Sequence, residues 1–203
     1  FPICDLFEYF SPDHPLVLKH LEKTMLPILE FGGTHPVVLC RQTTSYAIGV
    51  FAQNSKNDTF NKYQHKLLGI LKKLSKRPDG PLAKDFIDDT ITNEVAFLVD
   101  NIGGAYGKIL KYHENTLNQS AIVNEWLRYL PLKADQPEMQ RQHEFFADLI
   151  LGPKFELLYG ENQERKNLMA QKITEVRAMS EMIEDPMIKR KIENAYLKLT
   201  KTD

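Results

Sequence analysis

The spacing in this chain most suggestive of chemistry is that of three glycines, Gly103, Gly104 and Gly107. Glycine-rich backbone can wrap an anion with its N–H groups, which is how phosphate-binding loops work. Such loops stand between a strand and a helix, whereas these glycines fall inside a segment with helical apolar spacing. Close helix packing explains them better, although each glycine costs about 1 kcal/mol relative to alanine in a helix. We therefore expect no phosphate site here.

The nucleophilic and ionisable side chains form no catalytic or metal-binding pattern. The six histidines are scattered singly along the chain, and no pair of cysteines or carboxylates completes a zinc site around them: His14, His20, His35, His65, His113 and His143. The sequence also lacks a spacing that suggests a nucleophile with its base, or a paired acid and base. We expect no enzyme activity, no catalytic residue, no metal and no cofactor.

Cys4 and Cys40 are the two cysteines of the chain. They lie on separate predicted helices, and so few cysteines are typical of a reducing compartment rather than of a disulfide-rich secreted protein. We expect both thiols to be free and to serve as small, buried apolar side chains.

Composition limits the partners of this 203-residue chain. Its formal net charge of −1 gives no overall field that would attract nucleic acid, and 42% hydrophobic residues suffice for a continuous core. A run of about 20 apolar residues, which a membrane-spanning helix needs, is missing. We expect no direct nucleic acid and no membrane partner. Because the chain opens on Phe1 without a signal pattern, we expect it to be a piece of a longer protein.

Two local charge clusters carry alternative interpretations. An acidic cluster surrounds Phe86 and Ile87, and it is either a solvated loop or a landing place for a basic peptide: Asp85, Asp88, Asp89 and Glu94. A basic cluster precedes it, and it is better explained as cations that complement a helix dipole: Lys72, Lys73, Lys76 and Arg77.

Apolar residues recur at helical spacing along the whole chain, and Gly and Pro separate the segments, so we predict an all-α fold. The expected helices are Pro2–Phe10, Leu16–Phe31 with a bend near Pro27 and an end at Gly32-Gly33, one after His35-Pro36, one around Tyr63–Leu74, Asn93–Tyr112, Ser120–Leu130, one from Gln136-Pro137 to Gly152-Pro153, Asn162–Ile183, and one opened by Asp185-Pro186. We expect Leu98, Ile102, Ala105 and Ile109 to face the core, and Trp126 to be buried.

Two of these helices are similar in sequence. Arg41–Ala52 can be laid over Val99–Leu110 with small and apolar residues in the same positions. Equivalent helices recur about 40 to 60 residues apart, close to the roughly 40–47 residues of a HEAT or armadillo repeat. We predict a HEAT-repeat α-α superhelix (solenoid), with about three to four helix pairs in residues 1–152 and capping helices in residues 153–203.

Three strings resemble a known family. Arg41–Gln53 resembles the inner-helix signature of importin-beta-type karyopherins, particularly the branch that contains importin five. Val99–Ile109 is similar to their Asp-Asn…Gly-Lys inner helix, and Trp126–Asp135 to their Trp-Leu-x-x-Leu-Pro-Leu-x-x-Asp element. The order of the strings matches a carboxyl-terminal fragment of such a receptor.

The resemblance implies a nuclear transport receptor that shuttles between cytoplasm and nucleus. Its inner helices would line a concave surface for protein cargo with a nuclear localisation signal, and its outer helices would form grooves for nucleoporin Phe-Gly repeats. The main site for the Ran GTPase would lie in amino-terminal repeats outside this chain. The lack of a strongly acidic groove argues against long basic signals.

Matching the inner-helix motifs gives ten candidate protein-binding positions, which we expect on the exposed side of their helices. They are Gln42, Ser45, Tyr46, Gln53, Asp100, Asn101, Gly104, Lys108, Gln142 and Glu144. A solvated polar face without a partner is the competing interpretation for each. The alternative function is a HEAT-repeat scaffold subunit that assembles another protein complex, such as a phosphatase.

Overall fold

The computed structural model describes residues 2–75, 93–113, 119–153, 155 and 162–200, and all regular structure in these ranges is helical. The helices before the first gap are α1 (Pro2–Tyr9), α2 (Pro15–His20), a π-helical turn η1 (Leu21–Met25), α3 (Leu26–Thr34), α4 (Val38–Asn54) and α5 (Asn57–Ser75). Those after it are α6 (Asn93–Tyr112), α7 (Gln119–Tyr129), α8 (Gln136–Leu151), α10 (Gln163–Ala178), a 3-10 turn η3 (Ser180–Met182) and α11 (Pro186–Thr200). The prediction of an all-α chain is confirmed for these residues.

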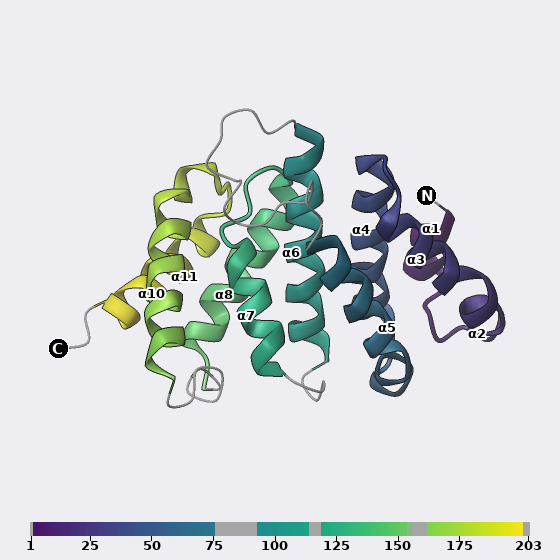
Figure 1. The fold of residues 1–203 in the computed structure, drawn as a ribbon. Coiled ribbons are helices and arrows are strands. Elements are labelled where there is room, and N and C mark those ends of the chain that lie inside the picture. Colours follow the sequence, from purple (N-terminus) through teal and green to yellow (C-terminus); the bar gives the residue numbers. More distant parts are fainter. Residues whose placement is uncertain (1, 76–92, 114–118, 154, 156–161, 201–203) are drawn as a thin grey trace.

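The helices pack mainly on neighbours that are close in sequence. One series of contacts runs from α1 to α4, α6, α8 and α11. Less extensive contacts link α3 to α5 and α7 to α10. Figure 1 shows the resulting elongated row, with the two chain ends at opposite ends of it. We call the helices α4, α6 and α8 the inner helices, because each has packed neighbours on more than one side.

The most extensive contact in the row joins α4 and α6. A Cβ atom added to Gly49 would lie 3.3 Å from the Cα of Ala105, so the two backbones approach closely. The predicted inward side chains are all buried: Leu98, Ile102, Ala105 and Ile109. Burial of such apolar area, worth about 25 cal/mol per Å², is what holds a row of this kind together.

Polar side chains fix where several helices begin. Asp135 accepts the backbone N–H of Glu138 at 3.1 Å, Asn162 that of Arg165 at 3.0 Å, and Asp185 that of Met187 at 2.7 Å. These bonds satisfy N–H groups that have no partner within the helix. The predicted starts of the last three helices are therefore confirmed.

The second predicted helix, Leu16–Phe31, differs from the structure in two ways. It is divided by the π-helical turn η1, and Pro27 stands in the first turn of α3, directly after that turn. It also continues through Gly32-Gly33 to Thr34. The glycines serve packing here: a Cβ on Gly33 would lie 2.8 Å from the Ile70 side chain, and one on Gly32 would collide with the Thr44 hydroxyl.

A second correction concerns the predicted helix Asn162–Ile183. Asn162 is the N-cap, α10 ends at Ala178, and η3 follows. Ile183 lies beyond η3 and is buried in the core. A continuous helix ending there was predicted because a helical turn and a 3-10 turn place apolar residues at similar spacing.

Several expectations fall outside the described residues. They concern Asp85, Phe86, Ile87, Asp88, Asp89, Lys76 and Arg77, and the side chain of Glu94. Within the described residues, Cys4 is buried and Cys40 half-buried, and both are free thiols. No described helix is long and apolar enough to cross a membrane.

Candidate functional site

The glycines of α6 allow α8 and its preceding segment to approach the helix axis. A Cβ on Gly104 would lie 2.6 Å from Oε1 of Glu138, and one on Gly103 2.8 Å from Tyr129 and Leu132 side chains. At Gly107 an added Cβ would overlap the Gln142 amide. The glycines therefore make room for polar side chains of α8, and the expectation of close packing is confirmed.

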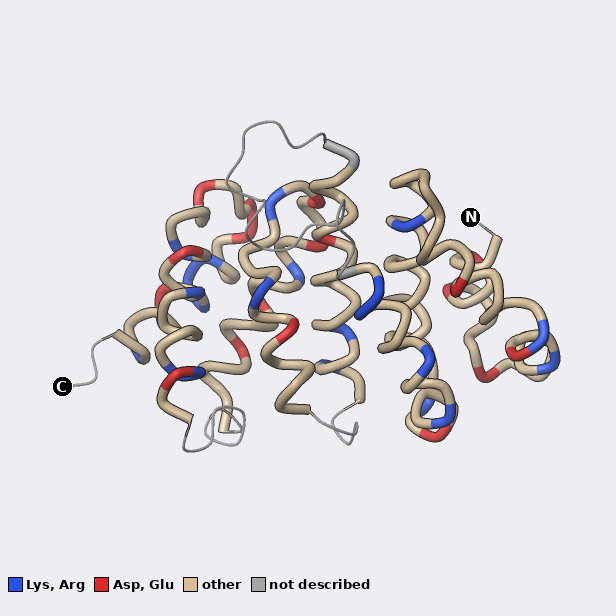
Figure 2. The backbone as a smooth tube through the Cα atoms, in the orientation of Figure 1, with Lys and Arg blue, Asp and Glu red and all other residues tan. Residues whose placement is uncertain are grey.

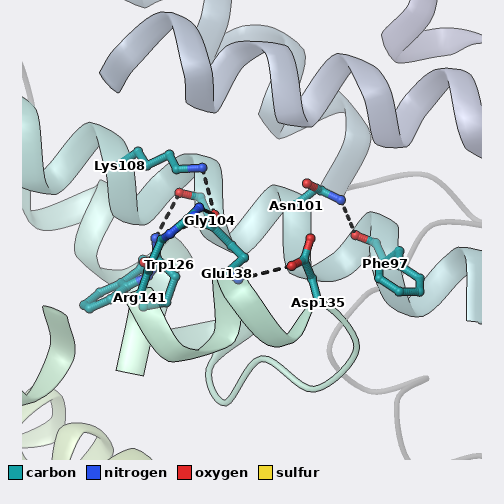
Figure 3. A network of polar contacts seen from close by, with 9 residues as sticks. Phe97, Asn101, Gly104, Lys108, Trp126, Asp135, Glu138 and Arg141 are labelled. Atoms are coloured by element: carbon teal, nitrogen blue, oxygen red, sulfur yellow. Dashed lines mark hydrogen bonds and ion pairs between the residues drawn. The ribbon is translucent and has the colours of Figure 1, made fainter. Parts of the chain in front are cut away.

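A buried polar network occupies the space that these glycines leave (Figure 3). Nζ of Lys108 on α6 lies 2.8 Å from Oε2 of Glu138 on α8, with both side chains under a tenth exposed. The Gln142 amide donates to Oε1 of Glu138 at 2.9 Å and to the Gly104 carbonyl at 3.4 Å. The indole N–H of Trp126 donates to Oε1 of Gln142 at 3.1 Å. The network thus satisfies its charges and amide internally, as buried polar groups require.

Trp126 is fully buried, as predicted from its helix. Its ring lies edge-on to Phe146 at a centroid distance of 5.5 Å and tilted against Phe145 at 5.4 Å. The side chain therefore joins the apolar interface of α7 and α8 to the polar network.

Asp100 anchors the segment between α7 and α8 rather than facing solvent. Its carboxylate accepts the backbone N–H groups of Lys133, Ala134 and Asp135, at 3.0, 2.6 and 2.8 Å. Burial raises the pKa of Asp100 to about 6, and the three N–H donors partly oppose that rise. The role of this residue is to set the start of α8, which places Glu138 and Gln142.

Two buried histidines also hold helix junctions. His143 accepts the backbone N–H of Leu132 at 3.2 Å, and burial lowers the pKa of its imidazole to about 4. His113 stacks on Phe60 at 3.9 Å, and its Nε2 donates to the Ala52 carbonyl at 2.6 Å, since a carbonyl can only accept. Burial lowers the pKa of His113 as well.

A solvent-open groove of about 420 Å³ lies beside the network, between α1, α4, α6 and α8. We call it the inner groove. Four of the predicted positions line it: Tyr46, Gln53, Lys108 and Gln142. Six further lining residues were not predicted: Glu8, Val50, Asn54, Lys111, Tyr112 and Arg141.

The exposure expected for the ten candidate positions is wrong for six of them. Buried are Ser45, Asp100, Asn101, Gly104, Lys108 and Gln142. Ser45 donates to backbone carbonyls of its own helix, Asn101 donates to the Phe97 carbonyl at 2.8 Å, and the others belong to the contacts above. Gln42 and Glu144 are half-buried, and Tyr46 and Gln53 are exposed. The cause is that the inner helices have packed neighbours on more than one side. The polar side of a simple amphipathic helix would instead face water.

A signal for part of the missed set was present in the sequence. Lys108, Lys111 and Tyr112 stand three and four residues apart, so they share one face of a helix. Arg141 directly precedes Gln142, but only the fold brings it to the same groove.

An apolar pocket of about 370 Å³ lies at the amino-terminal end of the row, between α1, α3 and α4. Ile3, Ile28, Phe31, Cys40 and Ala47 are among its lining residues. Within the described parts of the chain, His, Cys, Asp and Glu do not gather in threes as a metal site would need.

No protein-family model and no solved structure matches this chain.

Proposed function

We propose that this chain is a HEAT-repeat segment of an importin-type nuclear transport receptor, and that its inner groove holds an extended segment of a protein cargo. In this proposal residues 1–152 are stacked repeats and residues 153–203 cap them. The receptor would move between cytoplasm and nucleus, with its main Ran site in repeats outside this chain. It has no catalytic step, and its binding energy comes from side chains along the inner helices.

The observation that supports the proposal most is the order of the helix contacts. They run from each helix to near neighbours in sequence, in a series from α1 through α4, α6 and α8 to α11, and such nearest-neighbour contacts are typical of a solenoid. Such a row leaves its inner surface open over several helices, and here that surface is hollowed where α4, α6 and α8 meet. The strings that resemble the receptor family lie on or next to these same helices.

The apolar pocket supports the Phe-Gly part of the proposal. Its volume of about 370 Å³ falls in the roughly 300–1,000 Å³ range of small-ligand sites, and its apolar lining suits a phenyl ring. Ile28 is half exposed at its rim. A contact this small is expected to be weak, like other transient interfaces below about 1,200 Å².

The test is a titration of the chain with a Phe-Gly repeat peptide and a matched Ser-Gly peptide, followed by NMR chemical shifts. We expect weak binding of the Phe-Gly peptide alone, weakened further by Ile28→Asp and unchanged by Lys66→Asp on the exposed side of α5. We also expect only weak binding of Ran-GTP. Equal responses to the two peptides, or tight Ran-GTP binding by this chain, would refute the receptor proposal. The scaffold alternative instead predicts a stable stoichiometric complex with a phosphatase subunit and no Phe-Gly binding.

A further inference from the structure

We infer that the segment held by the inner groove is acidic: an extended peptide with Asp or Glu side chains. The inference rests on the proposed function, since it names the chemistry of the partner that the groove would take. It is carried by the charges and donors that line the groove, and above all by Lys111 and Arg141, the two lining cations outside the buried Lys108–Glu138 pair.

Positive charge outnumbers negative charge along the groove. Among the described residues that line it, the cations are Lys108, Lys111 and Arg141 and the carboxylate is Glu8, with Glu138 in the network behind it. Nζ of Lys108 lies 2.8 Å from Glu138 and neutralises it, so that carboxylate is largely used. Of the described lining residues, this leaves two cations, Lys111 and Arg141, and one carboxylate, Glu8.

Arg141 is placed to donate hydrogen bonds to a ligand carboxylate. Its guanidinium lies 3.7 Å from Oε2 of Glu138, the oxygen that Lys108 already holds at a shorter distance, and its side chain is 66% exposed. A guanidinium fork can bind a carboxylate through two parallel hydrogen bonds, a stronger arrangement than its long contact with Glu138. Binding such a group therefore gains an interaction without breaking the buried pair.

Lys111 and two tyrosines extend the positive wall. Lys111 follows Lys108 by one helical turn, and its ammonium stands 5.7 Å from the Tyr112 ring centroid. The Lys108 ammonium stands 5.5 Å from the Tyr46 ring centroid, and both tyrosine side chains are partly exposed. Burial raises the pKa of the Tyr46 phenol, which therefore stays protonated and can donate to an oxygen.

The opposite wall suits a peptide backbone rather than a free ion. Gln53 at the end of α4 presents an exposed amide, whose donors and acceptor match the N–H and C=O groups of an extended chain, while the Asn54 amide beside it already donates to the Phe7 carbonyl at 3.2 Å. Carboxylates spaced along that chain would meet Arg141 and Lys111 on the other side. A basic segment would instead meet two cations and a single exposed carboxylate, Glu8, which disfavours it.

The experiment uses the whole chain and three short fluorescein-labelled peptides: alternating Glu and Ser, alternating Lys and Ser, and alternating Gln and Ser. Fluorescence anisotropy at low and high salt should give the tightest binding for the Glu peptide, with affinity that falls as salt rises. Lys111→Glu/Arg141→Glu should weaken that binding about tenfold or more, the effect of losing one or two charge-assisted hydrogen bonds. The matched control is Lys189→Glu/Arg190→Glu, which makes the same charge change on exposed residues of α11 and should leave affinity unchanged.

Circular dichroism melts verify that each variant is folded. Arg141→Gln is a milder change that should also weaken binding of the Glu peptide, by a smaller factor. Tighter binding of the Lys peptide by the unaltered chain, or equal losses in the groove and control variants, would overturn the inference. If the Glu peptide does not bind most tightly but the Phe-Gly peptide binds as expected, the acidic partner is refuted and the receptor proposal stands. Groove-dependent binding of the Glu peptide with equal Phe-Gly and Ser-Gly responses refutes the receptor proposal and supports the groove.

Discussion

The contact of α6 with α8 and the contact of α8 with α11 both contain a lysine paired with glutamate, in opposite surroundings. The Lys108–Glu138 pair is buried and shares its carboxylate with the Gln142 amide. Lys191 lies 2.6 Å from Glu144 and 3.1 Å from Asp148, with all three side chains a third or more exposed. Figure 2 shows positive and negative residues mixed over the helices. Removing one partner is strongly destabilising only where the pair is buried, because the other charge is then left without solvent or partner.

Trp126→Ala should produce the largest loss of stability. The ring is fully buried between α7 and α8 and bonds to the network through Gln142. Removing a large aromatic from a core typically costs about 3–5 kcal/mol. Chemical denaturation should report a loss in that range, and Trp126→Phe should cost less because it keeps most of the packing. A loss below about 1 kcal/mol in Trp126→Ala would contradict the burial described here.

Glu138→Ala should also destabilise the protein strongly, because it leaves the Lys108 ammonium buried without its partner. Breaking a buried ion pair in this way costs about 3–5 kcal/mol. The control is Lys108→Met/Glu138→Met, which removes both charges and should recover much of the loss. If the double variant were as unstable as the single one, the loss would come from packing rather than from an uncompensated charge.

Apolar spacing predicted the helices and their buried side, and Leu98, Ile102, Ala105 and Ile109 are buried as expected. The polar side of the same helix was predicted to face solvent, yet Asp100 and Lys108 are buried too. The periodicity of a sequence shows which side of a helix is apolar and which side is polar. It cannot distinguish a polar side that meets water from one that meets the polar groups of another helix, because both select the same residue types.

The same limit applies to breaks in the chain. Pro137 in the first turn of α8 and Gly152 directly after it mark its ends as predicted, since both residues restrict the backbone itself. Gly32-Gly33 was predicted to end a helix and instead packs against Thr44 and Ile70 within one. Only the partner helices decide between these two uses of glycine.

His143 should make stability fall as the pH falls. The pKa of its imidazole drops from the ordinary 6.5 to about 4 in the folded chain, so the unfolded chain binds more protons between these values. The full effect corresponds to about 3 kcal/mol. Asp100 acts in the opposite direction, because its raised pKa favours the protonated folded chain in part of the same window.

Denaturation of His143→Gln against pH isolates the first contribution. The variant should lose less stability than the unaltered chain as pH is lowered from 6.5 to 4. Asp100→Asn should show the reverse, a steeper acid loss, because it removes the group that opposes His143. Identical slopes for all three proteins would show that neither pKa is shifted by folding.

Lys191→Met should have the smallest effect. Its ammonium is partly exposed and its partners are solvated, so we expect a loss of at most about 1 kcal/mol, reduced further by salt. A loss as large as that of Glu138→Ala would remove the difference between the two contacts. The comparison uses the same denaturation measurement for both variants.

Chemical-shift mapping of the chain with the alternating Glu and Ser peptide tests most directly whether the inner helices form a binding surface. We predict that the amides of Tyr46, Gln53, Lys111 and Arg141 shift together and saturate at one concentration. Amides on the exposed sides of α5 and α7 should stay unchanged. Shifts confined to α5 and α7, or none at saturating peptide, would contradict a binding role for the inner groove.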